Sequence, residues 1–151
     1  AQAQARETLT AARNHKLELH VLNVRSESDF DAVFADTKRL RVDGLVIGAG
    51  SVFVRDIKKL AALTVRHAVP AIYQYRDFPA AGGLMSYGSD ILDSYRLAGV
   101  HTGRILKGEN PAELPVLQAT KFELVINLKA AKALGISVPP SMQARADEMI
   151  E

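Results

Sequence analysis

Two side chains with evident ligand chemistry, Tyr75 and Arg76, follow the apolar run at residues 69–73. A guanidinium pairs well with a carboxylate through two parallel hydrogen bonds, and an aromatic ring beside it can stack on the rest of a ligand. Tyr73 differs from Tyr75 because it continues the apolar run, so we expect Tyr73 in the core and Tyr75 in contact with ligand. These residues predict contact with a small ligand that carries a carboxylate.

Three more polar residues close other apolar runs. Ser86 and Tyr87 end the run at residues 84–87 and offer hydroxyl groups, while Asn23 lies near the end of the run at residues 17–24. In sheets of parallel strands, ligands bind beyond the carboxyl ends of the strands. We therefore expect Ser86, Tyr87 and Asn23 to line the same ligand-binding cleft.

A further loop, Gly48-Ala-Gly-Ser51, lies between the apolar run at residues 45–49 and a helix that begins near Phe53. Glycines let a backbone approach a ligand closely, and the free N–H groups at the start of a helix attract anions. Gly50 and Ser51 are therefore candidate ligand-binding residues. The alternative is a tight turn in which Ser51 serves only as the N-cap, because the loop lacks the lysine of a P-loop and a complete G-x-G-x-x-G motif.

The residue patterns of catalysis, metal binding and nucleic-acid binding are missing from the sequence. It contains no cysteine, its four histidines do not have the spacing of metal ligands, and no serine lies in a G-x-S-x-G turn. The net charge is +2, and basic and acidic residues are interspersed without a basic arm. We therefore expect no enzyme activity, no cofactor or metal, and no binding of nucleic acid.

Alternating strand and helix patterns must position the candidate residues. Apolar runs with strand character lie at residues 17–24, 45–49, 69–73, 84–87 and 122–127. Segments with helical spacing of apolar residues lie at 5–14, 29–41, about 53–66, 90–107 and 128–134, with a last helix after residue 140. Strands joined by single amphipathic helices form right-handed crossovers and a parallel sheet, so the sequence predicts a doubly wound α/β fold.

Residues 83–90 read Gly-Leu-Met-Ser-Tyr-Gly-Ser-Asp, and three further segments lie at 104–115, 120–127 and 133–140. Together these four segments resemble the C-terminal part of the ABC transporter substrate-binding proteins with the type I periplasmic-binding-protein fold. The resemblance implies two α/β lobes joined by a hinge, with a small solute held between them and delivered to an ABC permease. It also implies a periplasmic location, or an exported and membrane-anchored full-length protein, and no catalysis.

Two other functions are compatible with parts of the pattern. The first is the effector-binding domain of a transcription regulator, which has the same fold. Such a regulator would require a helix-turn-helix segment upstream of this domain. A small flavodoxin-like enzyme is the second alternative, and it would require a cofactor-binding loop or a nucleophile with its base.

On this resemblance residues 1–151 form a single lobe, and the preceding lobe is missing. The chain begins at Ala1 in a helical run without an initiator methionine or a capping residue, which predicts a piece of a longer chain. The helix at 90–107, which Ser89 or Asp90 can cap, carries an apolar stripe made of Ile91, Tyr95, Ala98, Thr102 and Ile105. In proteins of this fold such a helix tends to pack on the missing lobe. In its absence we expect the helix to pair with a second copy or to fold back onto its own sheet.

Overall fold

The computed structural model describes residues 2–117 and 121–151, apart from the side chains of residues 2 and 3. Five strands form one sheet in the order β1-β2-β3-β4-β5. Their bounds are Leu45–Val46, Ala71–Tyr73, Met85–Ser89, Phe122–Asn127 and Glu148–Ile150. Neighbouring strands are parallel except for β3 and β4, which pair in antiparallel fashion. The predicted α/β class, with a mostly parallel sheet, is confirmed.

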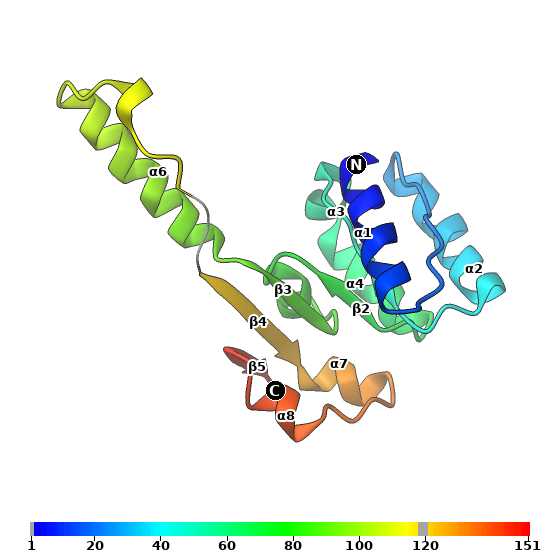
Figure 1. Ribbon diagram of the computed structural model, residues 1–151. Coiled ribbons are helices and arrows are strands. Elements are labelled where there is room, and N and C mark those ends of the chain that lie inside the picture. The colour runs from blue at the N-terminus through cyan, green and yellow to red at the C-terminus, as the bar shows by residue number, and fades with distance from the viewer. Residues whose placement is uncertain (1, 118–120) are drawn as a thin grey trace.

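Helices connect and flank the strands (Figure 1). The longer helices are α1 (Gln2–Asn14), α2 (Phe30–Leu40), α4 (Ile57–Arg66) and α6 (Ile91–Leu106). The shorter ones are α3 (Ser51–Arg55), α5 (Asp77–Ala80), α7 (Leu128–Ala133) and α8 (Pro140–Gln143), with the 3-10 helices η1 (Glu27–Asp29) and η2 (Pro111–Glu113). The helix expected at 53–66 is interrupted at Asp56, where α3 ends and α4 begins. No helix in the described part of the chain has the length and apolarity needed to cross a membrane.

Two apolar clusters lie on opposite faces of the sheet. The first joins α2, α4 and α5 to the parallel strands and includes Phe30, Phe34, Leu60, Tyr73 and Phe78. The second joins β4 to α7 and the segment after it, and comprises Leu84, Ile126, Ala131 and Val138. Side chains alternate between the two faces along a strand, so Tyr73 on β2 contacts the first cluster and Ile126 on β4 contacts the second.

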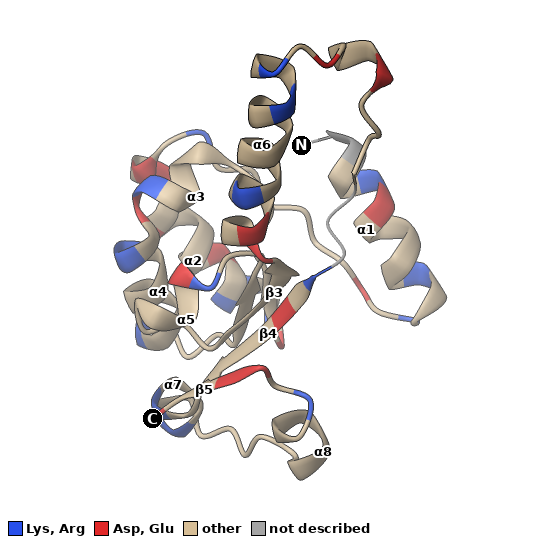
Figure 2. Cartoon of the chain, turned by 90° about the vertical axis from the view of Figure 1, so that its left-hand side faces the viewer, with Lys and Arg blue, Asp and Glu red and all other residues tan. Residues whose placement is uncertain are grey.

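Helix α6 leaves the sheet as a projecting arm, together with the segment that follows it (Figure 1; residues 90–117, here called the α6 arm). None of the residues in α6 is buried. Its exposed large apolar side chains include Ile91, Leu92, Tyr95, Ile105 and Leu106. Figure 2 shows that most of α6 is uncharged, its charged residues being Asp93, Arg96 and Arg104. The predicted stripe therefore faces solvent in the described chain and does not fold back onto the sheet.

Asp90 anchors the base of the α6 arm. The sequence allowed either Ser89 or Asp90 as the N-cap of this helix, and the structure shows that it is Asp90. Its carboxylate accepts hydrogen bonds from the backbone N–H groups of Leu92 and Asp93, at 2.9 and 3.1 Å. Lys121 Nζ lies 2.7 Å from Asp90 Oδ2, and the Asp90 N–H donates to the Lys121 carbonyl at 3.0 Å. The hydrogen bond from Lys121, aided by those from the backbone, lowers the pKa of Asp90.

The prediction of a strand at residues 17–24 is wrong. The segment is extended but lies outside the sheet, and two of the side chains that its pattern placed in the core, Leu17 and Val21, are 65% and 48% exposed. An extended segment becomes a strand only where a neighbour offers free backbone groups along its length. Strand β1 at the edge of the sheet has only two residues, so it offers little length along which a further strand could pair.

Candidate functional site

A small pocket lies where the carboxyl ends of β2 and β3 meet the amino end of β4. Its lining includes Gln74, Tyr75, Arg76, Ser86, Gly88 and Glu123. We call it the strand-end pocket. The structure thus brings together three of the residues predicted from the sequence, Tyr75, Arg76 and Ser86, and adds Gly88 and Glu123, which the sequence analysis did not single out.

Strand register explains why these residues converge. Tyr73 on β2 pairs with Ser86 on β3, and Gly88 on β3 pairs with Glu123 on β4. Paired residues in a sheet point to the same face, and residues two apart on one strand do so as well. The side of the sheet that carries Tyr73 therefore also carries Ser86 and Glu123.

Arg76 has internal carboxylate partners. Its Nη1 lies 3.7 Å from Glu123 Oε2, and its Nη2 donates to the carboxylate of Glu148 on β5. The guanidinium is 43% exposed, so it is open to the pocket as well as paired. These two contacts connect the end of β2 to both β4 and β5, and they hold the guanidinium at the pocket.

The buried ring of Tyr73 packs against the ring of Tyr75. The rings of Tyr73 and Tyr75 meet edge to face, with centroids 5.4 Å apart. Tyr73 is buried as predicted, and this burial raises the pKa of its phenol to about 12. Its hydroxyl has no hydrogen-bond partner among the described residues. The sequence-based assignment of Tyr73 to the core is confirmed, whereas Tyr75 is partly exposed at the pocket.

Gly88 permits the close approach of two backbones at the pocket. A Cβ atom at this position would lie 2.1 Å from the carbonyl oxygen of Gln74, far inside van der Waals contact. No side chain larger than hydrogen can be placed there without moving the backbone after β2. Gly88 therefore sets the distance between β3 and the residues that carry Tyr75 and Arg76.

The loop at residues 48–51 lies apart from this pocket and is arranged differently from the prediction. Gly50, not Ser51, occupies the N-cap position, and Ser51 is the exposed first residue of the short helix α3. The N–H group of Ala49, which a bound anion would use, donates instead to Gln4 Oε1 of α1 at 3.1 Å. Neither Gly50 nor Ser51 lines the strand-end pocket.

Two other predicted residues also lie outside the strand-end pocket. Asn23 is exposed within the extended segment before η1. Tyr87 lies on the face of β3 opposite Ser86, is 57% exposed, and stacks on Phe122 with centroids 5.9 Å apart. Strand alternation separates Tyr87 from Ser86, because adjacent residues of a strand point to opposite faces.

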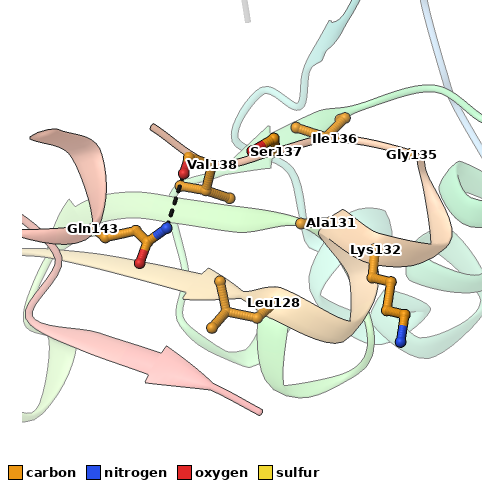
Figure 3. Close-up of a pocket in the computed structure, with 8 residues that line it drawn as sticks. All are labelled: Leu128, Ala131, Lys132, Gly135, Ile136, Ser137, Val138 and Gln143. Carbon is orange, nitrogen blue, oxygen red and sulfur yellow. Dashed lines mark hydrogen bonds between the residues drawn. The ribbon is translucent and has the colours of Figure 1, made fainter. Parts of the chain in front are cut away.

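A second, more open pocket of about 420 Å³ lies between α7 and α8 (Figure 3). Its lining comprises Leu128, Ala131, Lys132, Gly135, Ile136, Ser137, Val138 and Gln143. Gln143 Nε2 donates to the Val138 carbonyl at 2.8 Å, which orders one wall. Lys132 is the one charged residue in this lining, so the pocket offers less chemistry for a charged solute than the strand-end pocket.

Comparisons with known proteins agree with this architecture. Residues 1–150 match the family model described as ABC transporter substrate binding protein. A search of curated proteins found no match.

Three solved structures share the fold. They are a conserved domain protein from Vibrio cholerae (22% identity, TM-score 0.86), an ABC domain in complex with L-Trp from Streptococcus pneumonia (23%, 0.88), and a ligand-free, open substrate-binding protein with adhesive properties from Clostridium difficile (15%, 0.71). The matches cover 98%, 99% and 99% of this chain, which spans 50% of each of those chains. Because the family model matches nearly the entire sequence, the chain belongs to the ABC transporter substrate-binding protein family.

Proposed function

We propose that this chain is the C-terminal lobe of the substrate-binding component of an ABC importer. The observation that carries the proposal is the family match over residues 1–150. In this proposal the strand-end pocket supplies one wall of a cleft between two lobes, where a small solute binds without chemical change. The protein acts in the periplasm, or exported and membrane-anchored, and delivers the solute to an ABC permease.

The solute that we propose is a small molecule with a carboxylate, such as an amino acid. Arg76 provides the charge-assisted hydrogen bonds, Tyr75 the stacking surface and Ser86 a hydroxyl. The Streptococcus neighbour, which shares the fold at 23% identity, was solved in complex with L-Trp, and this supports the choice of an amino acid. Ser51, Gly50, Asn23 and Tyr87 lie outside this pocket, and we assign them no contact with the solute in this lobe.

We expect Arg76→Ala to weaken solute binding by about 30-fold, or 2 kcal/mol, because a hydrogen bond to a charged group is lost. The measurement is calorimetric titration of the complete two-lobed protein with a panel of L-amino acids. Arg96→Ala is the matched control, since Arg96 is an exposed arginine on α6 that pairs with Asp93 at 2.9 Å. Unchanged affinity in Arg76→Ala, with a native melting temperature, would exclude Arg76 from the site.

The α6 arm is, in this proposal, the surface that docks on the preceding lobe. Its apolar stripe is exposed here, and burying each large apolar side chain stabilises a protein by about 1.5–3 kcal/mol. The chain spans half of each solved neighbour, so the part that precedes it in a longer protein is available to cover the stripe. Without that part, a second copy of the chain covers it.

We therefore expect residues 1–151 alone to self-associate, and Tyr95→Asp to make them monomeric. Tyr95 is 70% exposed on α6, so a charge there opposes burial of the stripe without disturbing the core. Sedimentation velocity over a range of concentrations measures the effect. Tyr87→Asp is the control, because Tyr87 is an exposed tyrosine on the sheet. A wild-type chain that stays monomeric at every concentration would contradict pairing through α6.

A further inference from the structure

Glu148 contacts the guanidinium that the proposed function assigns to the solute. Arg76 Nη2 donates a hydrogen bond to the Glu148 carboxylate. Arg76 lines the strand-end pocket, whereas Glu148 does not and reaches the guanidinium from β5. The group that would bind a carboxylate of the solute is therefore already paired with a carboxylate of the chain itself.

The backbone of β5 holds Glu148 at this position. Just before it, the Asp147 N–H donates to the Leu124 carbonyl at 2.9 Å, and the Leu124 N–H donates back to Asp147 Oδ2 at 2.8 Å. Glu148 itself is the register partner of Val125 on β4. Its side chain is 46% exposed, so rotation about its own bonds carries the carboxylate into water. Glu148 can therefore leave Arg76 without any change in the sheet.

A solute carboxylate has no other cation to bind in this pocket. Among the described residues of the lining, Arg76 is the one with a positive charge. Carboxylates flank both ends of its guanidinium, with Glu123 3.7 Å from Nη1 and Glu148 bonded to Nη2. A solute carboxylate that forms two parallel hydrogen bonds must take the place of one of them. Glu148 is the one free to move, because Glu123 is only 19% exposed.

We infer that Glu148 is an internal competitor for Arg76, which must turn away before the carboxylate of a solute can bind. This inference rests on the proposed function and adds a residue outside the pocket that sets its affinity. Only molecules in which Glu148 has turned away bind, so the apparent affinity of every carboxylate solute is lowered by the fraction of such molecules. A simple carboxylate merely replaces Glu148. A retained solute must therefore also gain contacts elsewhere, with Tyr75 or Ser86.

The test is calorimetric titration of the complete two-lobed protein and its variants with L-tryptophan, L-phenylalanine and L-leucine. Glu148→Gln keeps the size of the side chain and removes its charge. We expect it to raise the affinity for each amino acid that binds by about two- to fivefold, the factor that corresponds to an exposed ion pair. The factor should be the same for every one of them, because the competition precedes the contacts that distinguish solutes.

Glu27→Gln is the matched control. Glu27 pairs with Lys59 at 2.7 Å, and these side chains are 47% and 43% exposed, against 46% and 43% for Glu148 and Arg76. This control removes the same charge from a similarly exposed pair outside the pocket lining, and it should leave the affinity unchanged.

A double variant separates competition from a general effect of charge. Arg76→Ala with Glu148→Gln should bind no more tightly than Arg76→Ala alone, because Glu148 competes only through Arg76. A gain that persists in the double variant would contradict the inference.

The outcomes also distinguish this inference from the proposed function. Unchanged or weaker binding in Glu148→Gln, with a native melting temperature, would overturn the inference, since Glu148 would then only hold Arg76 in place. The proposed role of Arg76 would survive that result if Arg76→Ala still lost affinity. If neither the wild type nor Glu148→Gln binds any of the three amino acids while folded by circular dichroism, the proposed solute class fails and the inference fails with it.

Discussion

Phe78→Ala should lower the free energy of unfolding by about 3–5 kcal/mol, the usual range for removing a buried phenylalanine. Phe78 is fully buried at the centre of the first apolar cluster, and its ring meets that of Tyr73 edge to face at 6.0 Å. Its backbone also closes the turn after β2, because the Phe78 N–H donates to Tyr75 and its carbonyl accepts from Gly83. The ring therefore holds the segment that carries Arg76 against the core.

Urea denaturation followed by circular dichroism measures this effect. Phe122→Ala is the matched control, since Phe122 is 52% exposed on β4 and stacks on the exposed Tyr87. We expect that control to lose about 1 kcal/mol or less. Similar losses for the two variants would mean that Phe78 does not lie in a closely packed core.

The second large effect is expected for Gly88→Ala, which should lower the free energy of unfolding by about 3 kcal/mol. Overpacking costs about 1–3 kcal/mol, and the upper end applies here because the new methyl would meet a backbone atom, Gln74 O, at 2.1 Å. A backbone carbonyl cannot rotate aside as a flexible side chain can. The strand ends must separate instead, which also moves Arg76 away from Glu123.

At another glycine, Gly99, we expect substitution by alanine to raise the free energy of unfolding instead of lowering it. Gly99 lies within α6, and a Cβ atom there meets nothing within 4 Å. Alanine should therefore stabilise the helix by about 1 kcal/mol through its higher helix propensity. If Gly88→Ala proved as harmless as Gly99→Ala in the same denaturation experiment, the close approach of β3 and Gln74 would be disproved.

The strands with the strongest apolar runs were predictable from the sequence. The run at 122–127 coincides with β4, and the runs at 69–73 and 84–87 contain or overlap β2 and β3. The segment at 17–24 has an equally regular pattern, yet it lies outside the sheet. A pattern reports which side chains prefer burial, but it does not report whether a neighbouring strand has backbone groups left to pair with.

The candidate site was predictable only where it obeys the rule of parallel sheets. Tyr75, Arg76 and Ser86 come from the ends of strands, and that rule led to them. Glu123 comes from the beginning of a strand, and it reaches the pocket because β4 runs antiparallel to β3. The direction of a strand follows from the whole topology and not from its own residues. A charged residue within an otherwise apolar run was the one local signal that marked Glu123.

Gly88 and Glu148 were missed for a similar reason. A glycine in a strand indicates that something approaches closely, but the sequence does not say that the approaching atom is the carbonyl of Gln74. Glu148 lies on β5, a strand of three residues without an alternating pattern. Its contact with Arg76 joins positions 72 apart in the chain. Such contacts are properties of the folded chain.

The α6 arm has a consequence for how the chain tolerates insertion. Strands β3 and β4 are neighbours, so the arm is in effect a very long hairpin loop of about 32 residues between Ser89 and Phe122. The entropy lost on closing a loop grows only with the logarithm of its length, by about 0.6 kcal/mol per doubling. A turn of about four residues would close the same hairpin at a saving of only about 2 kcal/mol. The sheet can therefore accept wide variation in the length of this arm, while the strands that carry the strand-end pocket keep their register.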